Sequence, residues 1–137
     1  MKEKDKGLAI LLGVIIDLVL LYLLYFKLIK NKQDLIYTYF MLFIHLIYYY
    51  GVYYNITYLI DITHITIPLS FLVTPLLKST YLKVLNFSLL IVIQLLWVFK
   101  GYCIMSTSNI KGCGDLFTII ALLWSLYLLY DITYPLT

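Results

Sequence analysis

The sequence has very few charged residues for its length. Asp, Glu, Lys and Arg make up 12% of the 137 residues, hydrophobic residues make up 64%, and the mean hydropathy is +0.96. A soluble domain carries about a quarter charged residues, so this composition excludes a soluble globular domain. Low charge combined with high hydrophobicity also excludes an intrinsically disordered chain. We therefore expect one compact domain embedded in a membrane, with the lipid bilayer as its surroundings.

The basic residues are few and scattered, and none of them is arginine. A nucleic-acid-binding surface needs a contiguous basic patch, so the sequence predicts no nucleic-acid partner. The small groups of lysine stand at the ends of apolar runs, and we interpret them as anchors that flank membrane spans. These groups are Lys2, Lys4 and Lys6; Lys27, Lys30 and Lys32; Lys78 and Lys83; and Lys100 and Lys111.

Sequence motifs of common catalytic and ion-conducting sites are also missing. There is no Gly-rich phosphate loop, no His-Glu-x-x-His pair, no Gly-x-Ser-x-Gly elbow and no Thr-Val-Gly-Tyr-Gly filter. The whole chain contains 2 histidines and 2 cysteines. We therefore expect a protein that is not an enzyme, with no catalytic residues, no metal and no cofactor.

Long apolar runs fill the rest of the sequence. A membrane-spanning helix needs about 20 mostly apolar residues, and in lipid every backbone polar group must be satisfied within the protein. The runs therefore predict an all-α integral membrane bundle of four to five transmembrane helices that form a single domain. The last run either crosses the membrane or lies along its surface. The predicted spans are residues 7–26, 35–54, 56–77, 82–99 and 116–134.

The second and third spans meet in a stretch rich in tyrosine. Amphipathic tyrosine rings favour the headgroup level, so this stretch predicts an interface and a chain reversal near Gly51 to Thr57. Pro68 and Pro75 within the third span predict a kinked helix, because neighbouring helices can satisfy the carbonyls that proline frees. The alternative is one longer helix over 35–60 followed by a re-entrant segment over 62–77.

Five polar residues inside the spans form a sparse intramembrane polar seam: Asp17, His45, Asp61, His64 and Gln94. Helix rise places Asp17 and His45 at a similar depth in an antiparallel hairpin, where they could pair. An unpaired charge at that depth costs at least about 2.5 kcal/mol, so Asp17 should face the bundle. Asp61 and His64 share a face of the third span, and Gln94 is a candidate for contact with Asp61.

The seam has more than one interpretation. Polar residues can join helices that have no hydrophobic reason to associate in lipid. The same residues could instead form a proton or ion path or a ligand pocket. His45 and His64 on adjacent helices could also ligate a b-type haem, as paired histidines do in small respiratory membrane anchors.

Cys103 and Cys113 flank the most polar loop of the chain. They could be two reduced thiols, or they could form a disulfide that closes the loop if it faces an oxidising compartment. Redox catalysis is the third interpretation, although catalytic dithiols commonly use a Cys-x-x-Cys spacing.

Three short pieces of the segment from His64 to Cys103 form a pattern: His64 and Pro68, the turn Leu77-Lys78 to Tyr81-Leu82-Lys83, and the helix end Trp97-x-Phe99-x-Gly101-x-Cys103. With these residues the segment resembles a family of small, uncharacterised, polytopic membrane proteins encoded by large DNA viruses. The resemblance implies a viral membrane or a host organelle membrane as the location, and it implies no catalytic residues.

These observations favour a multi-pass membrane protein with a structural or assembly role, which would contact membrane-protein partners or copies of itself. The first alternative is a small channel that conducts protons or ions through Asp17, His45, Asp61 and His64. The second is a respiratory membrane anchor that binds haem or quinone.

Overall fold

The computed structural model describes residues 3–100 and 114–134 of the chain. This part of the protein is helical and contains no strand, which confirms the all-α fold class. Cys103 and Cys113 lie outside the described residues, so their redox state stays a prediction. The helices are α1 (Glu3–Tyr25), α2 (Lys32–Tyr53), α3 (Thr57–Val73), the short 3₁₀-helix η1 (Thr74–Leu76), α4 (Thr80–Lys100) and α5 (Gly114–Thr133).

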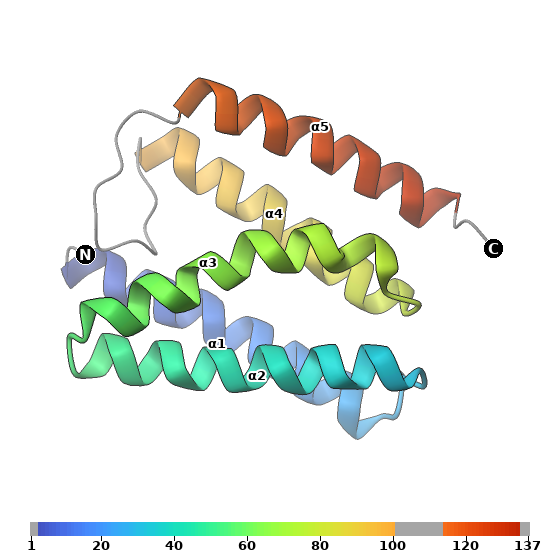
Figure 1. Cartoon of the computed structure of the whole chain (residues 1–137), viewed down its shortest axis with the longest axis horizontal. Helices are drawn as coiled ribbons and strands as arrows, with labels where there is room; N and C mark the ends of the chain where they lie inside the picture. Colours follow the sequence, from blue (N-terminus) through green and yellow to red (C-terminus); the bar gives the residue numbers. More distant parts are fainter. Residues whose placement is uncertain (1–2, 101–113, 135–137) are drawn as a thin grey trace.

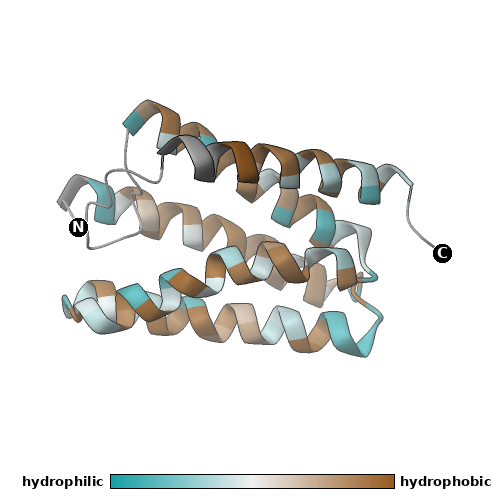
Figure 2. Cartoon of the chain, turned by 45° about the horizontal axis from the view of Figure 1, so that its top comes forward, coloured by the Kyte–Doolittle hydropathy of each residue, from teal (hydrophilic) through white to brown (hydrophobic). Residues whose placement is uncertain are grey.

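Four of these helical segments are long and apolar enough to cross a membrane, which identifies a multi-pass membrane protein. They are α1, α2, α4 and the continuous segment of α3 with η1. The apolar part of α5 that the structure describes, Ile119–Thr133, is shorter. Hydrophobic residues cover most of the helical ribbons, whereas many hydrophilic residues lie toward helix ends (Figure 2).

The turn between α1 and α2 uses a left-handed residue and a side-chain cap. Lys27 has a φ of 52°, and the N–H of Leu28 donates to the carbonyl of Leu23 at 2.9 Å. Asn31 then accepts a hydrogen bond from the N–H of Gln33, which caps the start of α2. This short turn makes α1 and α2 an antiparallel hairpin.

The turn between α2 and α3 has a similar design. Asn55 has a φ of 56°, and the N–H of Ile56 donates to the carbonyl of Gly51 at 2.8 Å. A Cβ atom on Gly51 would lie 3.0 Å from the Cβ of Leu59, so glycine allows the close approach of α3. Because α2 ends at Tyr53, the alternative of one helix over 35–60 is wrong.

The two prolines of the third span have different effects. Pro68 lies inside α3, which continues to Val73. Pro75 is at the start of η1, where the α-helix gives way to a 3₁₀ turn. The hydroxyl group of Thr74 donates to the carbonyl of Ser70 at 2.9 Å, so a side chain satisfies part of the backbone at this transition.

The helices pack as two neighbouring groups that α3 connects. Helices α1, α2 and α3 contact each other in sequence, α5 packs along α4, and α3 leads from α2 across to α4 (Figure 1). One end of the bundle carries the α1–α2 turn and the η1–α4 turn. We call it the lysine end, because its exposed basic residues are Lys27, Lys30, Lys32 and Lys78.

Candidate functional site

The carboxylate of Asp17 on α1 is bonded to two side chains of α2. The imidazole Nδ1 of His45 lies 2.5 Å from Asp17 Oδ1. The hydroxyl of Tyr49 donates to Asp17 Oδ2 at 2.6 Å. We call these three residues the Asp17 cluster. The structure thus brings Asp17 and His45 together and places the carboxylate against the neighbouring helix.

Gly13 makes room for the third member of the Asp17 cluster. A Cβ atom at Gly13 would lie 2.6 Å from the hydroxyl oxygen of Tyr49, which is closer than real contacts allow. Gly13 and Asp17 are one helical turn apart on α1, as His45 and Tyr49 are on α2. Two matching pairs with one-turn spacing therefore form this helix contact. Tyr49 was not among the polar residues predicted to pair, although its position one turn after His45 places it on the same face of α2.

The tyrosines around the turn between α2 and α3 differ in exposure: some face outward and others lie within the bundle. Tyr53, Tyr54 and Tyr58 are exposed, as expected for rings at the headgroup level. In contrast, Tyr48 is buried and Tyr49 reaches Asp17. These two tyrosines therefore pack within the bundle, whereas the exposed tyrosines of this stretch face outward.

Asp61 and His64 are neighbours on α3, as their spacing predicts. Both side chains are partly buried, and the Asp61 carboxylate acts electrostatically on the His64 imidazole. Both carboxylate oxygens of Asp17 are taken by His45 and Tyr49. Asp61 and His64 lie on α3, whereas the members of the Asp17 cluster lie on α1 and α2.

Gln94 on α4 bonds to α5, whereas the sequence suggested Asp61 on α3 as its partner. Its amide Nε2 donates to the hydroxyl of Ser125 at 2.9 Å. Ser125 in turn donates to the carbonyl of Ala121 within α5. Depth alone suggested Asp61 as the partner, but the rotation of α4 about its axis directs this amide to α5.

Asn86 forms a polar cluster that the sequence analysis did not include. Its amide Nδ2 donates to the hydroxyl of Tyr37 at 2.7 Å and to Thr74 Oγ1 at 2.8 Å. All three side chains are buried. We call them the Asn86 cluster, and it links α4 to α2 and η1.

Asp34 connects the two turns of the lysine end. Its side chain is buried, and Oδ1 and Oδ2 accept hydrogen bonds from the backbone N–H groups of Lys78 and Ser79 at 3.0 and 2.7 Å. These N–H groups immediately precede α4, where a carboxylate also interacts favourably with the helix dipole. Asp34 on α2 therefore caps the start of another helix.

Lys83 and Asp131 form an ion pair between α4 and α5. The Lys83 Nζ lies 2.5 Å from Asp131 Oδ2, and the two side chains are only 10% and 7% exposed. The interpretation of Lys83 as an anchor that flanks a span is therefore wrong. Because α5 lies over this part of α4, the lysine points into the bundle and is neutralised there.

A small cavity lies beside His45 of the Asp17 cluster. It measures about 20 Å³, and Gly13, His45, Tyr48 and Ser70 contribute to its lining. A cavity of this size can hold about one water, which needs two to four polar partners. Apolar side chains supply the rest of the wall: Leu12, Ile16, Met41, Ile67, Leu89 and Ile93. The cavity is thus largely apolar.

The histidines do not fit a shared haem. His45 lines the cavity of about 20 Å³, which is far too small for a porphyrin, and His64 is not part of that lining. The Nδ1 atom of His45 is bonded to Asp17. Among the described residues, no group of three or more His, Cys, Asp or Glu side chains could hold a metal ion. The arrangement therefore supports helix-to-helix bonding better than cofactor chemistry.

Comparisons with known proteins give no second source of functional residues. Neither protein-family models, nor curated proteins, nor solved structures match the chain. The resemblance of the segment from His64 to Cys103 to viral membrane proteins stays a prediction. The candidate site consists of the interhelical contacts described above.

Proposed function

We propose that the protein is a non-enzymatic structural or assembly component of a membrane. The observation that carries this proposal is the pairing of its buried polar side chains across helix contacts. The Asp17 cluster joins α1 to α2, the Asn86 cluster joins α4 to α2 and η1, and the Lys83–Asp131 pair joins α4 to α5. Such bonds hold helices together in lipid, where hydrophobic association is absent.

The surface left for partners is apolar. Each helix exposes large hydrophobic side chains, so a partner would meet the protein mainly through its lipid-facing helices. The resemblance of residues 64–103 to viral membrane proteins supports a viral membrane as the location, with an organelle membrane as the alternative. Examples of the exposed residues, one from each helix, are Leu18, Phe43, Leu72, Val98 and Leu126.

Proton or ion conduction is the main rival function. Asp17 and His45 lie inside the spans and share a hydrogen bond, as conducting residues often do. A conducting path needs a continuous series of exchangeable groups or waters across the membrane. The cavity beside His45 is lined mostly by apolar side chains, which favours helix-to-helix bonding over such a series.

Proteoliposomes distinguish the two functions. We expect vesicles that contain the protein and a pH-sensitive dye to show the same proton leak as empty vesicles under an imposed potential. Asp17→Asn should leave this leak unchanged and lower the free energy of unfolding. A proton flux that Asp17→Asn abolishes would instead establish conduction and refute the structural proposal.

A second measurement tests the assembly role directly. The tagged protein, extracted from its native membrane in mild detergent, should elute with a membrane protein at a fixed stoichiometry or as a defined oligomer. Recovery of monomeric protein alone, under conditions that preserve other membrane complexes, would contradict the assembly role.

A further inference from the structure

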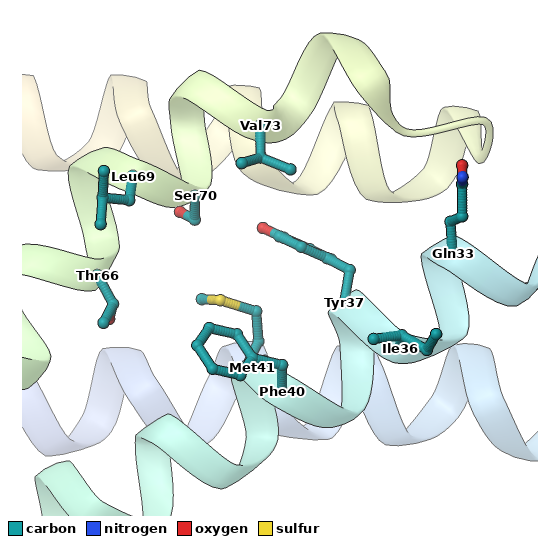
Figure 3. A pocket seen from close by; sticks show the side chains of 9 residues that line it. All are labelled: Gln33, Ile36, Tyr37, Phe40, Met41, Thr66, Leu69, Ser70 and Val73. Carbon is teal, nitrogen blue, oxygen red and sulfur yellow. The ribbon is translucent and has the colours of Figure 1, made fainter.

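Helices α2 and α3 diverge toward the lysine end (Figure 1), and side chains of both helices line a groove between them (Figure 3). The groove has a volume of about 310 Å³ and is open on one side. Binding sites for small ligands commonly begin at about 300 Å³. The lining residues are Gln33, Ile36, Tyr37, Phe40, Met41, Thr66, Leu69, Ser70 and Val73.

The walls of the groove suit a hydrocarbon chain. The lining is almost entirely apolar. Its hydroxyl groups are already bonded within the protein: Thr66 donates to Thr63, Ser70 donates to Ile67, and Tyr37 accepts from Asn86. A chain without polar groups can therefore occupy the groove and leave no buried polar side chain unsatisfied.

The length of the groove matches one leaflet of a bilayer. Its α2 wall runs from Gln33 at the membrane surface to Met41, which is roughly 12 Å along the axis at about 1.5 Å per residue. The hydrocarbon of one leaflet is about 15 Å thick, half of a core of about 30 Å. An acyl chain that enters beside Gln33 would therefore lie in the groove over most of the thickness of one leaflet.

Exposed lysines belong to the same end of the bundle as the mouth of the groove. Gln33 at the mouth follows Lys32, and Asp34 holds the backbone of Lys78 next to α2. With Lys27 and Lys30, these lysines give the lysine end four exposed positive charges.

Among residues 3–100 and 114–134, no exposed acidic side chain offsets this charge at the lysine end. The two carboxylates that the structure describes there, Asp34 and Asp131, are buried and bonded to the backbone of the η1–α4 turn and to Lys83, respectively. The exposed charges at the mouth therefore remain available to a negatively charged headgroup.

We propose that the groove between α2 and α3 binds one acyl chain of an anionic phospholipid, whose phosphate lies at the exposed lysines beside Gln33. The apolar groove supplies the site for the chain, and the lysines select the headgroup. Each lysine near an anionic headgroup strengthens binding by about fivefold.

Native mass spectrometry of the purified protein in detergent tests the proposal. The probes are palmitoyl-oleoyl phosphatidylglycerol, which is anionic, and palmitoyl-oleoyl phosphatidylcholine, which has the same chains and no net charge. We expect one tightly bound phosphatidylglycerol per protein and much weaker binding of phosphatidylcholine. Lys32→Gln combined with Lys78→Gln should reduce the preference for phosphatidylglycerol by roughly 25-fold.

A pair of tryptophan variants on α3 tests the location. Leu69→Trp should fill the groove and abolish the bound lipid, whereas Leu72→Trp should retain it. Both leucines are about half exposed, but only Leu69 lines the groove. Circular dichroism and the thermal midpoint of each variant verify that both variants fold.

Three results would overturn the proposal. The first is lipid binding that Leu69→Trp does not change. The second is equal binding of the two lipids, which would show that the lysines do not select an anionic headgroup. The third is a protein dimer that Leu69→Trp dissociates while no lipid is bound, which would assign the groove to a second copy of the chain.

Discussion

The indole N–H of Trp124 on α5 donates a hydrogen bond of 3.0 Å to the carbonyl oxygen of Phe71 on α3. In a continuous α-helix the backbone N–H of residue 75 would bond to this carbonyl, but Pro75 has no N–H. The N–H of Thr74 reaches the same oxygen in a 3₁₀ pattern. The proline that ends α3 thus creates a site on the backbone where α5 docks.

Removal of this donor should weaken the attachment of α5. Trp124→Phe keeps an aromatic ring and loses the N–H, and we expect the free energy of unfolding to fall by about 0.5–1.5 kcal/mol. Unfolding in mixed micelles with increasing SDS, followed by circular dichroism, measures this change. In a Pro75→Ala background the restored backbone N–H competes for the carbonyl, so the cost of Trp124→Phe should shrink. An equal cost in both backgrounds would contradict the link to proline.

The contact between Gly13 and Tyr49 predicts opposite effects for two identical substitutions in α1. Gly13→Ala places a Cβ atom against the Tyr49 hydroxyl and displaces the ring from Asp17, so we expect a loss of about 1–3 kcal/mol in the free energy of unfolding. Gly7→Ala is the matched control, because among the described residues no atom beyond its own stretch of helix lies within 4 Å of the added Cβ. It should be neutral or stabilise the helix by up to about 1 kcal/mol.

The comparison of the two glycine variants separates the effect of packing from the effect of helix propensity.

Tyr49→Phe removes the hydrogen bond to Asp17, which should cost about 0.6 kcal/mol and at most about 1.7 kcal/mol. The double variant Gly13→Ala with Tyr49→Phe should lose less than the sum of the two, since both disturb the same bond. Strict additivity would show that Gly13 acts independently of Tyr49.

The Lys83–Asp131 pair predicts a strong asymmetry between single and double substitutions. Lys83→Met leaves a buried carboxylate without a partner and should destabilise the protein by about 3–5 kcal/mol. Lys83→Met combined with Asp131→Leu removes both charges and should recover most of that loss. Limited proteolysis of the segment that precedes α5, together with SDS unfolding, reports whether α5 stays attached. A double variant as unstable as Lys83→Met would rule out ion pairing as the main contribution.

The carboxylate of Asp34 should stabilise the turn that precedes α4. Asp34→Ala leaves the N–H groups of Lys78 and Ser79 without their acceptor, and we expect a loss of about 1–2 kcal/mol. Asp34→Asn keeps one carbonyl oxygen as an acceptor and should lose less. Hydrogen exchange at residues 78 and 79 measures the opening of the turn locally. Unchanged exchange in Asp34→Ala would contradict the capping role.

Depth along the membrane was predictable from the sequence, whereas rotation about each helix axis was not. Asp17 and His45 meet because a short turn makes their helices antiparallel and places both side chains at one level. The same reasoning suggested Asp61 for Gln94, but Gln94 bonds to Ser125 on α5. The rotation of α4 depends on the sum of its side-chain contacts, which a depth count does not include.

Buried polar groups outside the predicted seam were the main omission. Asn86 and Asp34 lie near helix ends, where a polar residue suggests contact with water or headgroups. In the structure both side chains turn inward and bond to a neighbouring helix or turn. Sequence position near a span end does not distinguish these two environments.

The amino-acid sequence by itself determined that the protein lies in a membrane, that it is helical and where the spans approximately lie. The reason is that lipid leaves few ways to satisfy the backbone hydrogen bonds of long apolar runs. Only the tertiary structure decided which polar side chains pair, that Lys83 is buried, and that Phe71 receives Trp124. The physical reason is that apolar residues occur on both the buried and the exposed faces of these helices, so hydropathy does not say which face of a helix meets lipid and which meets protein. Close packing at positions such as Gly13 and Gly51 makes that choice.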